Sequence, residues 1–296
     1  MLPTHKKMPR WLPIMALFIS MLSIQSGASL AKTLFPLIGA PGVTAVRLAL
    51  GTLILAIIFK PWRLRFKKEQ RLPLLGYGLA LGGMNYLFYL SLKTIPLGVA
   101  VALEFTGPLA VALFASRRAV DFVWVVLAVA GLWFLLPLGQ EFADVDLTGA
   151  FYALGAGAGW AVYIICGQKA GAEHGPATVA MGSFIAALVF VPLGVIETGS
   201  ALWHWSILPL GLAIAVMSTA LPYSLEMIAL TRMPTRTFGT LMSVEPALAA
   251  VSGIVFLGEH LGFIQWVALA FIIAASAGST LTMKRESKIE RVDTPS

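Results

Sequence analysis

The feature that most constrains this chain is a succession of apolar runs, each about 20 residues long, the length that an α-helix needs to cross a bilayer. Hydrophobic residues fill 58% of the 296 positions and charged residues only 12%, whereas a soluble protein is about 25% charged. Within each run the apolar residues are continuous rather than alternating, which favours helices over a β-barrel. The sequence therefore predicts an all-α polytopic membrane protein with ten transmembrane helices near residues 11–31, 39–59, 72–92, 95–115, 120–139, 147–167, 177–196, 206–229, 237–257 and 262–282.

The first run follows basic residues and ends in small ones, a pattern that cleaved signal peptides share. Its apolar part is long for a signal peptide and nine more runs follow, so we expect it to remain as a membrane span. The single cysteine, Cys166, excludes an intrachain disulfide, and no two histidines have metal-ligand spacing. We expect no metal and no other cofactor.

Lys and Arg are distributed unevenly between the loops, and this asymmetry predicts the orientation. With a cytoplasmic N-terminus, all but three of the 21 basic residues lie on the cytoplasmic side, the exceptions being Lys32, Arg47 and Lys93. The opposite loops carry the acidic residues Glu141, Asp144, Asp146, Glu197 and Glu259. We therefore expect both termini in the cytoplasm. The same placement accounts for the net charge of +7 without a nucleic-acid partner.

The two halves of the chain resemble each other at a shift of 138 residues. The aligned positions are Pro96 with Pro234, Pro108 with Pro246, Leu92 with Leu230 and Asp121 with Glu259. This shift equates the fourth span with the ninth, so each half holds five helices. Because five is odd, the second copy is inserted upside down, as in transporters whose site lies between two inverted repeats. We predict repeats at 11–139 and 147–282 and a cytoplasmic tail at 283–296.

Two glutamates, Glu104 and Glu245, lie in the middle of predicted spans, where a charged group costs about 2.5–3.5 kcal/mol. Each has a proline nearby, Pro108 and Pro246, and a proline removes a backbone hydrogen bond. Such a break persists in a membrane only beside protein or a water-filled cavity. The pattern predicts a polar cavity at mid-depth, where a carboxyl group suits proton coupling; alternatively, each glutamate pairs with a basic residue and only locks helices together.

Three further ionisable residues are candidates for the same cavity. Glu226 lies nearer the cytoplasmic end of the eighth span, where its side chain could instead reach the interface. Lys32 and Arg47 lie toward the outer ends of the first two spans. Each could bind a substrate carboxylate or neutralise a membrane carboxylate, an arginine through a bidentate fork; extension to the interface is the alternative for both.

Polar and aromatic residues gather at similar depths. Asn85, Tyr86, Trp160, Tyr163 and Tyr223 complete the predicted substrate- and proton-binding set, and their neighbours include Gln25, Ser26, Ser29, Tyr89, Ser218, Thr219 and Ser224. A spacing of three residues puts Trp160 and Tyr163 on one helical face. These residues could line a small cavity; equally, they could cement helix contacts or fill space.

Several functional classes lack their sequence signals. There is no Walker loop for ATP, and no HExxH or Gly-x-Ser-x-Gly motif for hydrolysis. No loop is long enough to form a soluble catalytic domain. We therefore expect a transporter driven by an ion gradient or by the gradient of its substrate, and not an enzyme. A lipid-modifying membrane enzyme and a non-transporting subunit are the alternatives.

Three stretches are similar to motifs of one transporter family. Arg47 in TAVRLALGTLIL matches an arginine usual in the second helix, Trp160 in GWAVYIICGQK matches a sixth-helix pattern, and EPALAAVSGIVFLGEHL matches a ninth-helix ending. Together they resemble the paired EamA domains of the drug/metabolite transporter superfamily. The family's first-helix Trp-Gly pair is here Ser26-Gly27, so a site built on that tryptophan does not carry over.

A closer resemblance covers essentially the whole chain. GGMNYLFYLSL, PLGVAVALEFTGPLAVALFASRR and LPYSLEMIALTRMPTRTFGTLMS are similar to the small-amino-acid exporters of bacterial inner membranes. This resemblance implies export of L-threonine, L-homoserine and related amino acids, driven by the proton-motive force. The superfamily also admits other cargo, such as drugs, aromatic amino acids or nucleosides.

Our hypothesis is that the substrate ammonium meets Glu104 or Glu245. The substrate carboxylate would meet Arg47, Lys32 or backbone amides at a helix break. Its polar side chain would meet Asn85 or nearby hydroxyl groups. Protonation of a glutamate from outside would then release the substrate and reset the carrier.

Overall fold

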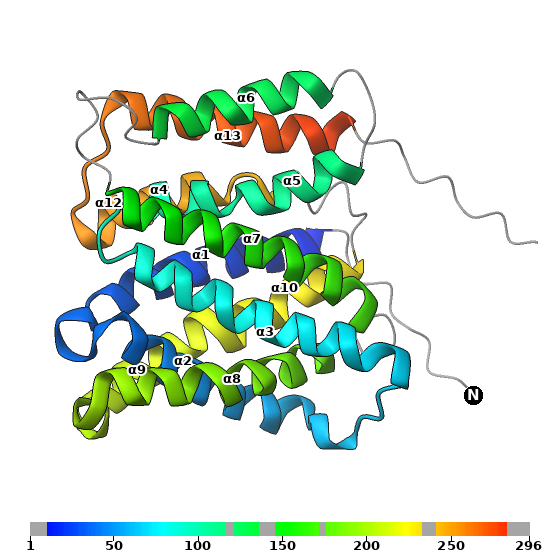
Figure 1. Cartoon of the computed structure of the whole chain (residues 1–296), viewed down its shortest axis with the longest axis vertical. Coiled ribbons are helices and arrows are strands. Elements are labelled where there is room, and N and C mark those ends of the chain that lie inside the picture. The colour runs from blue at the N-terminus through cyan, green and yellow to red at the C-terminus, as the bar shows by residue number, and fades with distance from the viewer. Residues whose placement is uncertain (1–10, 116–120, 136–145, 172–175, 233–240, 283–296) are drawn as a thin grey trace, which may run out of the picture.

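The computed structural model describes residues 11–115, 121–135, 146–171, 176–232 and 241–282, and within these ranges the chain is helical, without strands (Figure 1). The helices are α1 (Trp11–Lys32), α2 (Phe35–Phe59), η1 (Pro61–Arg63), α3 (Lys68–Ser91), α4 (Leu97–Glu104), α5 (Thr106–Ala115), α6 (Asp121–Leu135), α7 (Leu147–Ala170), α8 (Pro176–Thr198), η2 (Gly199–Trp203), α9 (Ile207–Ala215), the π-helical η3 (Val216–Ala220), α10 (Leu221–Arg232), α12 (Glu245–Leu257) and α13 (Phe263–Thr282).

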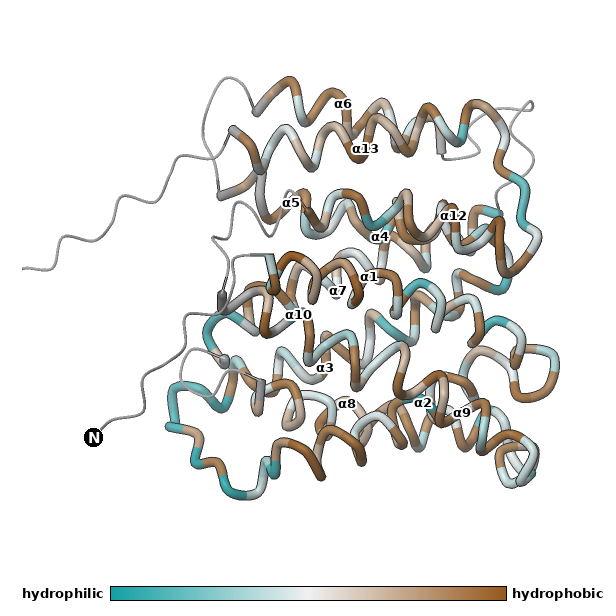
Figure 2. The backbone as a smooth tube through the Cα atoms, turned by 180° about the vertical axis from the view of Figure 1, so that it is seen from behind, coloured by the Kyte–Doolittle hydropathy of each residue, from teal (hydrophilic) through white to brown (hydrophobic). Residues whose placement is uncertain are grey.

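Within the described ranges, five helical stretches are long and apolar enough to cross a membrane by length and composition: Trp11–Lys32, Phe35–Phe59, Leu147–Ala170, Ala177–Trp203 and Ile207–Glu226. Shorter apolar helices are Leu97–Val111, Phe122–Phe134, Glu245–Leu257 and Phe263–Ser279. Apolar residues run along the helices, whereas the connection from α2 to α3 is strongly hydrophilic (Figure 2). The many large apolar side chains that remain exposed suit a surface that faces lipid. The prediction of an all-α multi-pass membrane protein is therefore confirmed.

The helices run side by side across Figure 1, and the main packing pairs join segments that are distant in the sequence. These pairs are α3 with α7, α2 with α8, α6 with α13, α3 with α8, α1 with α10 and α4 with α12. Small residues permit the closest approaches. A Cβ added at Gly98 in α4 would lie 2.7 Å from the Cα of Ala250 in α12, so the two backbones meet almost directly.

The predicted span at 95–115 is two helices rather than one. α4 ends at Glu104 and α5 begins at Thr106. Pro108 has no N–H to donate to the carbonyl of Glu104 four residues earlier, which is the cause that the sequence suggested. Gly157 of α7 packs against this break, because a Cβ there would lie 2.6 Å from the Glu104 carbonyl oxygen.

Other boundaries differ modestly from expectation. α2 begins at Phe35 rather than near 39, and it contains a kink at Gly39, whose positive φ of 67° suits glycine. α3 begins at Lys68, earlier than the expected 72. The segments 1–10, 116–120, 233–240 and 283–296, which carry many of the residues used to predict the orientation, lie outside the described residues.

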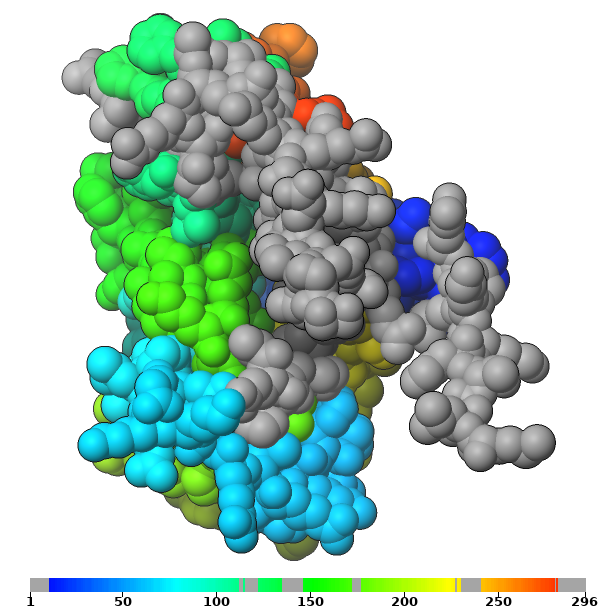
Figure 3. Space-filling model, turned by 90° about the vertical axis from the view of Figure 1, so that its right-hand side faces the viewer, coloured from blue at the N-terminus to red at the C-terminus, as the bar shows by residue number. Residues whose placement is uncertain are grey.

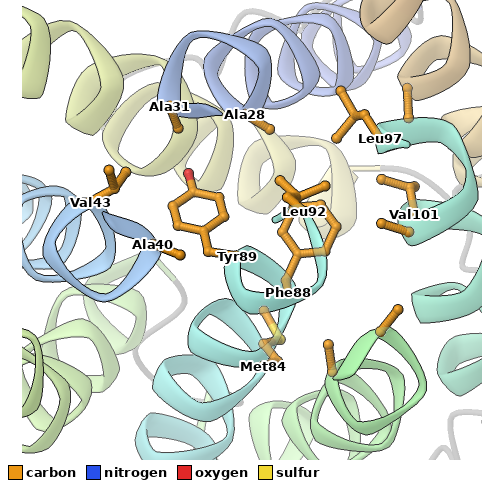
Figure 4. Close-up of a cluster of buried hydrophobic side chains, with 14 of the residues drawn as sticks. Ala28, Ala31, Ala40, Val43, Met84, Phe88, Tyr89, Leu92, Leu97 and Val101 are labelled. Carbon is orange, nitrogen blue, oxygen red and sulfur yellow. The ribbon is translucent and has the colours of Figure 1, made fainter. Parts of the chain in front are cut away.

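A cluster of buried side chains packs around Tyr89 of α3. Figure 4 shows Tyr89 between Ala31 of α1 and Ala40 and Val43 of α2, with Phe88 beside it. The alanines are small enough for three helices to converge here. This convergence places the polar residues of α1, α2 and α3 close together.

Candidate functional site: a polar cavity between the helices

A cavity of about 60 Å³ lies among α1, α2, α3, α4, α7, α10 and α12. Its lining residues are Ser20, Met21, Ile24, Gln25, Ala28, Arg47, Met84, Asn85, Phe88, Tyr89, Val101, Glu104, Trp160, Tyr163, Ser218, Tyr223, Glu226, Met242 and Glu245. Residues that are up to 225 positions apart in the chain therefore share one small space. The cavity combines one guanidinium, three carboxyl groups, an amide pair and several hydroxyl groups with apolar walls.

The structure brings eight of the ten predicted site residues to this cavity, namely Arg47, Asn85, Glu104, Trp160, Tyr163, Tyr223, Glu226 and Glu245. Lys32 and Tyr86 are placed elsewhere. Lys32 forms an ion pair with Glu259, and the hydroxyl of Tyr86 donates to Glu197 over 2.6 Å. Neither side chain lines the cavity.

Arg47 is the cation of the site, and only 2% of it is exposed. Its Nε donates to Thr219 Oγ1 over 2.9 Å, and its Nη2 donates to the carbonyl oxygen of Ser218 over 2.8 Å and to the Tyr223 hydroxyl over 3.2 Å. The guanidinium carbon also lies 5.2 Å from the centre of the Tyr89 ring. In the described part of the chain, no carboxylate forms an ion pair with Arg47. The buried guanidinium is therefore suited to bind the anionic group of a ligand.

The carbonyl of Ser218 is available to Arg47 because of a proline. Pro222 lies four residues further on and has no N–H to complete the helical hydrogen bond. The chain forms the π-helical turn η3 at this place, and such turns often occur at functional sites. Asn85 shares a partner with Arg47, since its Nδ2 also donates to the Tyr223 hydroxyl, over 3.2 Å.

Gln25 and Glu245 form a second polar group in the lining of the cavity. Gln25 Nε2 donates to Glu245 Oε1 over 3.0 Å, and both residues are buried, with 4% and 5% of their surfaces exposed. Glu245 is the first residue of α12, and it directly precedes Pro246 at the helix start. The remaining acceptor atoms, Gln25 Oε1 and Glu245 Oε2, have no hydrogen-bond partner.

Glu104 and Glu226 complete the set of carboxyl groups. Glu104 lies at the end of α4, where it interacts electrostatically with both Glu245 and Arg47. Glu226 lies one helical turn beyond Tyr223 in α10 and interacts with Glu245. Three carboxyl groups around one guanidinium cannot all be charged without strong repulsion.

Aromatic side chains form the walls. Trp160 packs edge-on against Phe105, with ring centres 5.5 Å apart, next to the break between α4 and α5. Tyr163 stacks on Tyr77 at 4.6 Å, and their hydroxyl groups lie 3.2 Å apart. The Tyr77–Tyr163 pair joins α3 to α7 beside the cavity.

Buried polar atoms without a partner concentrate in this lining: Gln25 Oε1, Glu245 Oε2, Tyr89 OH and Ser218 Oγ. A folded protein normally satisfies such atoms, so their clustering indicates a site for a polar ligand. Gln25 was grouped with the polar residues in the sequence but not chosen for the site, and the Ser218 carbonyl was missed. A proline four residues after a mid-membrane carbonyl was the available signal.

The described residues contain no group of three or more His, Cys, Asp and Glu side chains that could hold a metal ion. Nor do the lining residues offer a nucleophile with a partnered base. The arrangement instead presents separate sites for a cationic and an anionic group within one small cavity.

The chain is similar in sequence to known transporters. Residues 147–281 match the EamA-like transporter family. The chain is 77% identical to the threonine/homoserine exporter RhtA of Salmonella typhimurium and 76% identical to that of Escherichia coli, in each case over 97% of this chain and 98% of the relative. It is 32% identical to an uncharacterised transporter, YwfM of Bacillus subtilis, over 51% of each chain. A solved crystal structure with 18% identity has a TM-score of 0.60 over 90% of this chain and 98% of its own, which shows a shared fold.

Proposed function

Since this chain belongs to the EamA-like transporter family, we propose that it exports small amino acids, L-threonine and L-homoserine among them, across the bacterial inner membrane. Near-full-length similarity to threonine/homoserine exporters supports the choice of cargo. The observation that carries the proposal is that one small cavity is lined both by a buried guanidinium and by unpartnered acceptor atoms.

Arg47 on the one hand and Gln25 with Glu245 on the other suit the two charged ends of an α-amino acid. Arg47 would bind the substrate carboxylate, because charge-assisted hydrogen bonds to a guanidinium are strong and directional. The acceptors Gln25 Oε1 and Glu245 Oε2 would bind the ammonium, which offers three N–H donors. This assignment places the carboxylate at Arg47 rather than at Lys32, which pairs with Glu259.

The size of the cavity favours a small substrate. A water molecule needs about 10–15 Å³ by the same measure, so a cavity of about 60 Å³ holds only a few polar groups. A threonine hydroxyl would reach Asn85 or the Tyr89 hydroxyl, both of which line the space. An indole or a nucleoside would require the walls to move.

Proton coupling would use the carboxyl groups. The substrate ammonium and a proton would compete for Glu245. Glu104 interacts electrostatically with both Glu245 and Arg47. Protonation from outside would weaken ammonium binding and release the substrate. The proton-motive force would then drive net export.

For the architecture, we propose ten membrane spans in two inverted repeats, at 11–139 and 147–282. The first copy would comprise α1, α2, α3, α4 with α5, and α6; the second would comprise α7, α8, α9 with α10, α12 and α13. The packing supports this division, because exchanging the copies maps each main pair onto another observed pair. α3 on α7 becomes α10 on α1, α3 on α8 becomes α9 on α2, and α4 on α7 becomes α12 on α1, while α2–α8, α4–α12 and α6–α13 map onto themselves.

Both termini would be cytoplasmic, with the tail at 283–296 on the same side. The start of α1, the connection from α2 to α3 and the end of α13 lie toward one side of Figure 1, which supports this orientation. That connection holds Lys60, Arg63, Arg65, Lys67, Lys68 and Arg71. Its positive charge marks the cytoplasmic side by the positive-inside rule.

The test is efflux of labelled threonine and homoserine from preloaded cells, with and without a protonophore. The wild type, an empty control, Glu104→Gln and Glu245→Gln would be compared at equal membrane levels. We expect protein-dependent efflux that collapses with the protonophore and fails in Glu245→Gln. A panel of aromatic amino acids, nucleosides and drugs would be run in parallel; protein-dependent efflux confined to one of these would overturn the proposed cargo.

A further inference from the structure

A second hollow lies away from the central cavity, where the connection from α2 to α3 meets α8. It has a volume of about 680 Å³ and is lined by Leu64, Arg65, Phe66, Lys67, Arg71, Leu74 and Met181. The surface of this connection and of the start of α3 is coloured cyan in the lower part of Figure 3. We propose that this hollow binds the headgroup of an anionic phospholipid.

The charge of the hollow favours an anion. Among the lining residues that the structure describes, three are cationic and none is acidic. The wider segment from Lys60 to Arg71 holds six basic residues and a single acidic one, Glu69. α3 also begins at Lys68, and the N-terminus of a 24-residue helix adds partial positive charge at the same place.

The apolar half of the lining favours a lipid over a soluble anion. Leu64, Phe66, Leu74 and Met181 form a continuous apolar set beside the cations. Leu74 and Met181 belong to α3 and α8, so this wall leads from the connection toward the membrane-spanning helices. A phospholipid whose phosphate binds at Arg65 and Arg71 could therefore extend its acyl chains along the protein surface.

Residues that flank the lining in the sequence are exposed and apolar. Trp62, which precedes it, is 65% exposed, and Leu72, which follows Arg71, is 77% exposed. Exposed tryptophan is typical of the membrane interface, and basic pockets between membrane helices on the cytoplasmic side bind anionic headgroups. The hollow thus offers its cations at the depth where a lipid phosphate lies.

The hollow is also joined to the central cavity by packing. Leu74, Tyr77 and Ala170 form one buried cluster, and Phe66, Met181 and Tyr163 pack against it. Tyr163 is at the same time a lining residue of the cavity. An occupied hollow would therefore hold in place the stacked Tyr77–Tyr163 pair that borders the transport site; this consequence, unlike the binding itself, rests on the proposed function.

The test measures lipid binding to the purified full-length protein by native mass spectrometry. Phosphatidylglycerol would be compared with phosphatidylethanolamine of the same acyl chains, which has a phosphate but no net charge. The variant Arg65→Gln/Arg71→Gln removes two charges from the lining. The matched control Arg63→Gln/Lys68→Gln removes two charges from the same segment but outside the lining.

We expect the lining variant to bind phosphatidylglycerol about thirtyfold more weakly, since each of the two cations near the headgroup contributes about 1 kcal/mol. The control should change by less than about twofold, because exposed charges are screened. Equal losses in the two variants would show a diffuse electrostatic surface and overturn the site, as would equal binding of both lipids. If the double variant does not fold, Arg71→Gln alone should weaken binding by about fivefold.

A competition with inorganic phosphate separates a lipid from a soluble anion. Phosphate should leave the bound phosphatidylglycerol in place, because it cannot use the apolar wall. Displacement of the lipid by millimolar phosphate would assign the hollow to a soluble anion instead. Neither result depends on transport, so failure of the lipid site and failure of the exporter assignment are distinguishable.

Discussion

Lys32 and Glu259 fasten three helices together at one end of the bundle. Lys32 Nζ lies 2.6 Å from Glu259 Oε1, and Glu259 Oε2 accepts the backbone N–H of Leu97 over 2.8 Å. The carboxylate thereby joins the last turn of α1, the start of α4 and the loop that follows α12. In the proposed orientation, this contact lies on the outer side of the bundle.

Replacement of Glu259 should reveal the two bonds separately. Glu259→Gln loses the ion pair but retains an acceptor for Leu97, whereas Glu259→Ala loses both. A hydrogen bond to a charged group contributes about 1.5–3 kcal/mol, so we expect Glu259→Ala to lower the thermal midpoint of the purified protein more than Glu259→Gln. Lys32→Met should resemble Glu259→Gln. Equal losses for the two Glu259 variants would exclude a contribution from the Leu97 bond.

Arg47 should be required for export. Truncating one partner of a buried charge interaction costs about 2–5 kcal/mol, so Arg47→Met should lower the initial efflux rate by more than about tenfold. Arg47→Lys should also fail, because an ammonium cannot reproduce the bonds from Nε and Nη2. Thr52→Val is the control, since Thr52 is buried in the same helix and bonds to Ser183 away from the cavity. Near-normal efflux by Arg47→Met would exclude a role in carboxylate binding.

Gln25 should set the affinity for the substrate ammonium. Gln25→Leu removes an acceptor from the cavity and frees Glu245 of its amide donor. We expect the KM for threonine to rise about tenfold, the equivalent of about 1.4 kcal/mol, in reconstituted vesicles. Ser29→Ala is a matched control, because Ser29 also links α1 to α12, through Ser252 at 2.9 Å, but does not line the cavity. Equal effects of the two variants would indicate a purely structural role for Gln25.

Pro222→Ala should impair transport without loss of stability. The new N–H would compete with Arg47 for the carbonyl of Ser218. A proline within a helix costs about 3 kcal/mol, so the thermal midpoint should stay the same or rise while efflux falls severalfold. Pro192→Ala in α8 is the control, because the residue four positions before Pro192 is Leu188, which, unlike Ser218, does not line the cavity; efflux should be unchanged. Unaltered efflux by Pro222→Ala would show that the freed carbonyl is dispensable.

Gly107 should tolerate no side chain. A Cβ at Gly107 would collide with the carbonyl oxygen of Gly157, whereas one at Gly83 would meet Phe190 at an ordinary 3.6 Å. Overpacking of this kind costs about 1–3 kcal/mol or more. We expect Gly107→Ala to lower the yield of folded protein and Gly83→Ala to preserve it, as measured by size-exclusion chromatography in detergent.

The sequence predicted how deep in the membrane each polar residue lies better than it predicted which way its side chain faces around the helix. Glu104 and Glu245 were expected beside a cavity because they interrupt apolar runs near prolines, and the structure places both in its lining. Lys32 and Arg47 looked alike in the sequence, since both lie near the ends of spans. The rotation of each helix separates them: Arg47 points into the bundle, and Lys32 meets Glu259. Helix rotation depends on packing between distant segments, which periodicity alone does not determine.

Helix breaks, too, were predicted where their cause lies close by in the sequence and missed where it does not. Pro108 predicted the interruption after Glu104, because the missing N–H acts within four residues of the chain. The π-helical turn at Val216–Ala220 was not predicted, although Pro222 has the same local effect, because its form depends on the contact with Arg47. The role of Gln25 likewise depends on a partner 220 residues away. Its identification as a site residue, like that of the others, stays a prediction until transport is measured.

The contact between Gly98 and Ala250 has a mechanical consequence. Two backbones that nearly touch cannot move closer, and the surrounding apolar packing opposes their separation. If the bundle opens first to one side of a membrane and then to the other, we expect α4 and α12 to tilt about this contact rather than to slide apart. Glu104 is the last residue of α4 and Glu245 the first residue of α12, so both carboxyl groups lie at helix ends and a tilt about the Gly98–Ala250 contact would move them.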